Sequence, residues 1–249
     1  MPRRRAGTVG WVSPDDNPKI ATRFRLIPKP VERTFYAVLR PIVDGLIRAQ
    51  IRPNTITTIG TALVLLSAVA FGLGHIRIGG LVLLLSGVTD TLDGAVARGN
   101  AMVTRFGAFY DSTLDRVGDG ATFMGIAIYF MSTADVAQRM AAVSVCMIAI
   151  IASLIVSYAR ARAEGLGLDC KVGIAQRAER ILLVGVCTLI FGAGPRALLL
   201  EGVVGLLALA SVITVVQRFV YVYQVTQDDL PPRTSPHAAV DSTAKGSVQ

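Results

Sequence analysis

Charged side chains are scarce in this chain: Asp, Glu, Lys and Arg make up 17% of its 249 residues, whereas 52% are hydrophobic. A soluble domain carries about 25% charged residues. The mean hydropathy is +0.55, and long apolar runs recur between residues 53 and 226. These features exclude an ordinary soluble domain and predict an integral membrane protein.

Cysteine and histidine are also rare. Cys146 and Cys187 lie in apolar runs and Cys170 in an expected cytoplasmic loop, so no disulfide framework is indicated. His75 lies in an expected external turn and His237 in the C-terminal tail, which gives no support to a histidine-based mechanism. The first thirty residues contain several basic residues and no apolar run, so we expect no cleavable signal peptide.

The net charge of +8 is high enough to raise the question of nucleic-acid binding. The basic residues, however, lie between apolar runs and do not form one dense patch. We interpret them as topology signals and as contacts for anionic lipid headgroups, with no nucleic-acid partner.

The alternation of polar and apolar segments predicts an all-α integral membrane protein, with six transmembrane helices preceded by an interfacial amphipathic helix. Residues 1–28 are interpreted as a flexible cytoplasmic arm and residues 228–249 as a disordered cytoplasmic tail. Residues 31–50 are predicted to form the amphipathic helix, bent at Pro41, and residues 53–226 the six-helix membrane domain. An ordinary surface helix is the alternative for 31–50.

The six predicted spans place both termini on one side of the membrane. Loops on that side contain many of the basic residues, including Arg98, Arg160 and Lys171, whereas the opposite turns contain Arg77, Arg139 and Arg196. The positive-inside rule therefore predicts cytoplasmic termini at the cell membrane. The predicted spans are approximately 53–73, 76–96, 105–131, 135–163, 177–191 and 196–224.

Four aspartates lie at the cytoplasmic ends of the second and third predicted spans. Asp90 and Asp93 share one helix face, and Asp111 and Asp115 share a face of the next helix. An unpaired carboxylate near the hydrocarbon costs about 2.5–3.5 kcal/mol, so four of them imply a compensating cation. Oxygen ligands favour one or two divalent ions, Mg²⁺ or Mn²⁺.

Other roles for these carboxylates are possible from the residues alone. One is a helix-packing network with Arg98, Arg105 and Arg116; we also expect Asp119 to pair with Arg116, in a structural role. Another is a divalent-cation transporter. The position of the acids at helix ends on one side argues against a transport path. A catalytically silent scaffold is the third alternative.

The acidic stretch follows the pattern D-x2-D-G-x2-A-R-x8-G-x3-D-x3-D, in which Gly94, Ala97, Arg98 and Gly107 fill the other fixed positions. This pattern resembles the signature of the CDP-alcohol phosphotransferase family, and the resemblance covers roughly residues 53–218. It implies an enzyme that transfers the phosphatidyl group of CDP-diacylglycerol to an alcohol and releases CMP. It also implies a membrane-bound homodimer.

The resemblance assigns roles to the motif residues. It implies that Asp90, Asp93, Asp111 and Asp115 bind Mg²⁺ or Mn²⁺, with two ions expected. Asp115, one turn from a ligand, is also placed as general base for the acceptor hydroxyl. The implied donor-binding residues are Asn54, Gly94, Ala97, Arg98, Thr104 and Gly107.

Basic residues at the cytoplasmic ends of the last three predicted spans suggest a pocket for a phosphate monoester; binding of anionic lipid headgroups is the alternative. Segments 157–164 and 176–180 resemble bacterial phosphatidylinositol phosphate synthases, which use inositol 1-phosphate. That group usually has Lys where Arg160 stands and Pro where Ala178 stands. Phosphatidylglycerophosphate synthesis from glycerol 3-phosphate is the alternative activity. The predicted acceptor-phosphate residues are Ser157, Arg160, Arg177, Arg180 and Arg218.

Overall fold

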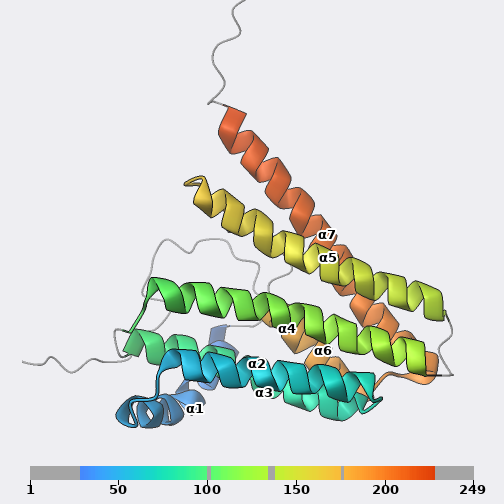
Figure 1. The fold of residues 1–249 in the computed structure, drawn as a ribbon, viewed down its shortest axis with the longest axis horizontal. Coiled ribbons are helices and arrows are strands. Elements are labelled where there is room, and N and C mark those ends of the chain that lie inside the picture. Colours follow the sequence, from blue (N-terminus) through green and yellow to red (C-terminus); the bar gives the residue numbers. More distant parts are fainter. Residues whose placement is uncertain (1–28, 100–101, 134–137, 175–176, 228–249) are drawn as a thin grey trace, which may run out of the picture.

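The computed structural model describes residues 29–99, 102–133, 138–174 and 177–227, so the predicted arm and tail lie outside the described residues. Within these ranges every regular element is helical (Figure 1), which confirms the all-α class. The helices are α1 (Lys29–Arg48), α2 (Pro53–Gly72), α3 (Ile76–Gly99), α4 (Arg105–Ser132), α5 (Arg139–Gly165), α6 (Arg177–Phe191), the short 3₁₀ helix η2 (Pro195–Ala197) and α7 (Leu198–Thr226).

Four helices of the described ranges are long and apolar enough to cross a membrane, namely α2, α3, α5 and α7 together with η2. In α4 the charged residues all lie between Arg105 and Asp119, and the second half of the helix is apolar. Helix α6 has 15 residues, fewer than the ~20 that a span usually needs. The structure thus supports a membrane protein, and six spans stay a prediction.

The helices pack in a chain of neighbours (Figure 1). Helix α2 contacts α3 and α4, α3 contacts α6, α4 contacts α5, and α5 contacts α7. The main apolar core is built from the second halves of α2 and α4 and the first halves of α3, α5 and α7, with Phe71, Leu83, Ile126, Phe130 and Leu200 fully buried. The bundle therefore has an apolar end, and the opposite ends of these helices are left for polar residues.

Close packing of α2 against α4 depends on one glycine. A Cβ atom on Gly125 would lie 2.2 Å from the carbonyl oxygen of Ala68, which is closer than real atoms approach. Small residues at such crossings allow two membrane helices to pack backbone against backbone. This contact holds the α4 carboxylates at a fixed distance from α2.

Helix α1 is continuous through Pro41 and contacts α3. Its Leu39 and Val43 are buried in a small cluster with Leu92 and Val96 of α3. The helix thus shields the turn of α3 that carries Asp93. Its predicted location in the membrane interface stays a prediction.

The last predicted span begins later than the sequence indicated. Arg196 and Ala197 have positive φ angles of 49° and 60°, which an α-helix does not accommodate, and Pro195–Ala197 forms a 3₁₀ turn instead. The α-helix therefore starts at Leu198 and not at Arg196. The fourth predicted span was expected from residue 135; residues 134–137 lie outside the described residues, and α5 begins at Arg139.

Candidate active site

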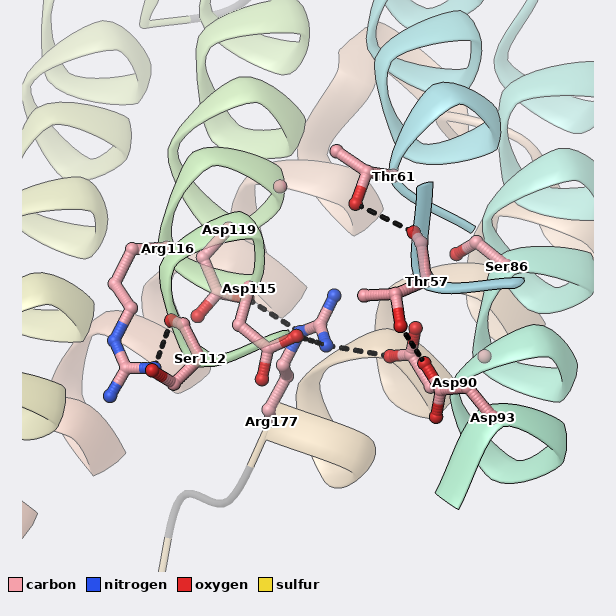
Figure 2. A network of polar contacts seen from close by, with 12 residues as sticks. Thr57, Thr61, Ser86, Asp90, Asp93, Ser112, Asp115, Arg116, Asp119 and Arg177 are labelled. Atoms are coloured by element: carbon pink, nitrogen blue, oxygen red, sulfur yellow. Dashed lines mark hydrogen bonds and ion pairs between the residues drawn. The ribbon is translucent and has the colours of Figure 1, made fainter. Parts of the chain in front are cut away.

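Asp90 and Asp93 of α3 face Asp115 of α4, with Arg177 from the start of α6 between them (Figure 2). Asp111 lies one turn before Asp115 on α4. Nη1 of Arg177 lies 2.6 Å from Oδ2 of Asp90 and also pairs with Oδ1 of Asp115. The cation that compensates these carboxylates in this structure is therefore Arg177. The helix-packing network that the sequence suggested as an alternative contained Arg98, Arg105 and Arg116 and did not include Arg177.

Asp93 is held by a residue that the sequence did not single out. The hydroxyl of Thr57, on α2, donates to Oδ2 of Asp93 over 2.7 Å, and both side chains are buried (Figure 2). A buried carboxylate needs such a partner to keep its orientation. Thr57 lies one turn after the start of α2, where a sequence pattern alone gives no signal of the contact.

The two α4 carboxylates lie ahead of the apolar half of that helix. Both side chains are partly buried, and Asp115 pairs with Arg177. A nearby divalent cation would stabilise both carboxylates in their charged form.

The oxygen donors of this cluster suit a hard divalent ion such as Mg²⁺ or Mn²⁺. Among the residues that the structure describes, however, no three His, Cys, Asp or Glu side chains gather closely enough to hold an ion. The guanidinium of Arg177 contacts both Asp90 and Asp115. An ion bound between these two carboxylates therefore requires Arg177 to release at least one of them.

The predicted donor-binding residues form two groups beside the acids. At the start of α4, the Thr104 hydroxyl caps the helix by accepting a 2.9 Å hydrogen bond from the Gly107 amide. A Cβ atom on Gly107 would lie 3.3 Å from Oδ1 of Asn54, so these three residues lie together. On α3, the Arg98 guanidinium lies over Gly94, one turn back, where a Cβ atom would be 3.2 Å from Nη1.

Ala97 belongs to the same α3 turn as Arg98 and is partly buried. Gly94 and Gly107 are partly buried as well. Their role toward a nucleotide stays a prediction.

A cavity of about 420 Å³ opens beside the acidic cluster, and Asp115 is part of its wall. It is bounded by the polar first half of α4, the last turns of α5, the second half of α7, the start of α6 and the loop that precedes α6. The five predicted acceptor-phosphate residues all line this one cavity: Ser157, Arg160, Arg177, Arg180 and Arg218.

The cavity arginines are engaged in different ways. Arg160 forms an exposed ion pair with Glu164 over 2.8 Å. Arg218 is buried and donates from Nε to the carbonyl of Val172 over 3.0 Å, and from Nη1 to the carbonyl of Val156. Arg218 therefore ties the loop before α6 to helices α5 and α7, in addition to lining the cavity.

Arg180 is 4% exposed and pairs through Nη2 with Asp119. Its Nε and Nη1 atoms are buried and have no hydrogen-bond partner among the described residues. Buried guanidinium groups without partners are costly, so an anion in the cavity would stabilise this side chain.

The spacing of Asp119 and Arg116 on α4 predicted an ion pair between them, and this prediction is wrong. Asp119 binds Arg180 and lies 3.7 Å from Nε of Arg177, while Arg116 donates to the Ser112 carbonyl. The buried partners across the helix interface replace the local pair. Lys171, which we did not predict as a site residue, also lines the cavity.

The profile of the CDP-alcohol phosphatidyltransferase family matches residues 50–220 of this chain. The chain belongs to this family. It is therefore an enzyme of phospholipid biosynthesis, as the acidic motif predicted. It is similar to the phosphatidylinositol phosphate synthase of Mycobacteroides abscessus, with 37% identity over 186 residues that cover 74% of this chain and 83% of the relative.

Two solved structures of the Mycobacterium tuberculosis phosphatidylinositol phosphate synthase resemble the fold. The complex with manganese and citrate superposes with a TM-score of 0.65 at 36% identity, covering 74% of this chain and 88% of that chain. The structure with CDP-DAG bound has a TM-score of 0.63 at 36% identity, covering 72% and 90%. The similarity thus extends over the helical bundle and nearly all of the relative.

Proposed function

We propose that this family member transfers the phosphatidyl group of CDP-diacylglycerol to a hydroxyl of inositol 1-phosphate, giving phosphatidylinositol phosphate and CMP. The observation that supports it most is the basic cavity that opens beside the motif carboxylates, with Asp115 and Arg177 in its wall. Its volume of about 420 Å³ falls in the range of about 300–1,000 Å³ typical of small-molecule sites. The relatives named phosphatidylinositol phosphate synthase give the same product by their name.

In this proposal the carboxylates of Asp90, Asp93, Asp111 and Asp115 would hold one or two Mg²⁺ or Mn²⁺ ions, which would supply positive charge to the oxygens of the donor pyrophosphate. Thr57 keeps the Asp93 carboxylate oriented through its hydrogen bond. Asp115 stands at the boundary between the acids and the cavity. It accepts the proton of the acceptor hydroxyl as that oxygen attacks the phosphorus.

The donor nucleotide lies over Gly94, Ala97 and Gly107 of α3 and α4, whose lack of large side chains leaves room for it beside the helix backbone. Thr104, Gly107 and Asn54 border it at the starts of α4 and α2, and Arg98 offers a guanidinium to a phosphate. The acceptor phosphate lies in the basic cavity. Arg180, whose Nε and Nη1 lack partners among the described residues, is its central ligand.

The protein acts at the cytoplasmic face of the cell membrane. We place six helices, α2 to α7, across the bilayer, α1 in the interface and both termini in the cytoplasm. The basic residues near the polar end of the bundle support this orientation. A homodimer is the expected assembly.

The deciding experiment supplies purified protein with CDP-diacylglycerol, Mg²⁺ and inositol 1-phosphate and follows CMP release. Phosphatidylinositol phosphate and CMP are expected in equal amounts. CMP release with glycerol 3-phosphate but not with inositol 1-phosphate would show a phosphatidylglycerophosphate synthase instead. If no polyol phosphate supports turnover, the proposed reaction is wrong.

A further inference from the structure

One wall of the basic cavity is a loop and not a helix. Lys171, Val172 and Gly173 line the cavity, and they belong to the segment that precedes α6, here called the cavity loop (residues 168–174). Cys170, within it, is fully buried. A loop that lines a binding cavity and also buries a side chain has a defined place in the fold.

The cavity loop is attached to one face of α7 at three points. Tyr221 donates its hydroxyl hydrogen to the Asp169 carbonyl over 3.1 Å, and Arg218 donates to the Val172 carbonyl over 3.0 Å. The Ile174 amide donates to the Thr214 hydroxyl over 3.2 Å. The three α7 residues are spaced i, i+4 and i+7, so they share one helix face.

Gly173 allows the loop to approach this face closely. Its φ angle is +136°, and a Cβ atom there would lie 2.4 Å from Cγ2 of Thr214. Any other residue would both strain the backbone and push the loop away from α7. The loop and the helix are thus matched at the point where both line the cavity.

Lys171 lies between two of the anchored carbonyls, those of Asp169 and Val172. Its ammonium pairs with the Asp169 carboxylate over 2.5 Å, with the two side chains 45% and 65% exposed. An ion pair this exposed contributes little and exchanges readily. The backbone position of Lys171 is fixed while its charge is available to another anion.

We propose that the cavity loop is a specificity-determining wall of the acceptor site, in which Lys171 contacts the phosphate monoester and the Thr214, Arg218 and Tyr221 face of α7 positions it. The inference rests on the proposed function of the cavity as the acceptor site. The ligand chemistry is that of a polyol phosphate, and inorganic phosphate is the minimal probe.

The first test measures binding of inorganic phosphate to the purified protein by calorimetry, with no donor present. Lys171→Gln is expected to weaken binding by roughly tenfold, which is the effect of losing one charge-assisted contact. Arg162→Gln is the matched control: it removes one cation from the same side of the protein, and Arg162 does not line this cavity. Equal binding by Lys171→Gln and wild type would overturn the proposal.

The second test compares two glycines of the same connection, both with positive φ. Gly173→Ala introduces a contact with Thr214, whereas a Cβ atom on Gly167, with φ +80°, meets no described atom within 4 Å. Gly173→Ala is expected to raise the acceptor KM by at least fivefold and leave the CDP-diacylglycerol KM unchanged. Gly167→Ala introduces the strain of a positive φ angle without a new contact, and it should leave the KM values for the acceptor and for CDP-diacylglycerol near those of wild type.

Parallel changes in both variants would mean that the loop has a general structural role only, and the positioning proposal would be wrong. Thr214→Val, which removes the acceptor of the Ile174 amide, should follow Gly173→Ala. If wild-type protein binds phosphate through Lys171 but turns over no polyol phosphate, the proposed reaction fails while the loop assignment stands. If turnover is normal and all variants keep the wild-type acceptor KM, the loop assignment fails alone.

Discussion

The acidic cluster and the basic cavity adjoin each other but are built in opposite ways. The acids come from 26 consecutive residues of the chain, Asp90 to Asp115, on two successive helices. The cavity is assembled from residues between Ser112 and Arg218, on four helices and a loop. A site on neighbouring turns can be recognised from spacing, whereas a site assembled across the fold depends on how the helices pack.

The two regions also treat charge differently. In the acidic cluster the carboxylates outnumber the cationic side chains that contact them, and Asp90 and Asp115 share the guanidinium of Arg177. In the cavity, Arg180 has guanidinium atoms without described partners. In the proposed function the first region receives a cation and the second an anion, and the following variants separate the two.

Asp93→Asn should have the largest effect, because it removes a buried carboxylate of the motif. We expect CMP release to fall by at least about a thousandfold. Asp44→Asn, which alters a carboxylate of α1 that does not line the cavity, is the control and should retain most of the turnover. Activity of Asp93→Asn within tenfold of wild type would remove this residue from the cation site.

Arg177→Gln should affect both regions. Loss of the shared guanidinium leaves buried carboxylates uncompensated, so the melting temperature in EDTA should fall by about 5–10 °C. Mn²⁺ should restore most of that stability, since it supplies the missing positive charge. Arg139→Gln, at the start of α5, is the control and should show no such response to Mn²⁺. If Arg177→Gln lost as much stability with Mn²⁺ as in EDTA, Arg177 would not be substituting for an ion.

Arg180→Ala should act mainly on the cavity. We expect the acceptor KM to rise by about 10- to 100-fold, with the CDP-diacylglycerol KM nearly unchanged. Arg180→Lys keeps the charge without the planar fork and should give an intermediate value. A normal acceptor KM for Arg180→Ala would exclude this side chain from phosphate binding.

Thr57→Val should have the smallest effect of the four. It removes the hydrogen bond to Asp93 without changing the shape of the side chain, so turnover should fall by about tenfold. Thr61→Val is the control, because the Thr61 hydroxyl donates to the Thr57 carbonyl in its own helix. Steady-state CMP release distinguishes the two, and equal rates would mean that Asp93 does not depend on Thr57.

The sequence predicted the helices and the acid motif because both depend on local periodicity. It placed the α6 range at 177–191, as observed. It failed where distant contacts replace local ones. Asp119 lies three residues from Arg116, which suggested a pair worth about 0.2–0.5 kcal/mol, yet the buried Arg180 across the α4–α6 interface is its partner.

Other residues gave no local signal. Thr57 and Lys171 became recognisable only when α2 was packed against α3 and the cavity loop against α7. Likewise, the identity of residue 196 as Arg did not indicate its left-handed backbone conformation, because of which α7 begins only at Leu198. The set of cavity arginines was predicted to lie together, and they do, but their individual partners required the fold.

Arg177 lies in the wall of the cavity and also among the acids, so its guanidinium links the two halves of the site thermodynamically. Whatever weakens its attachment to Asp90 and Asp115 leaves more of its charge for an anion in the cavity. By reciprocity, an anion that holds Arg177 makes those carboxylates better ligands for a cation. A cation at the acids and an anion in the cavity would then bind with positive cooperativity, because each frees the group that the other needs.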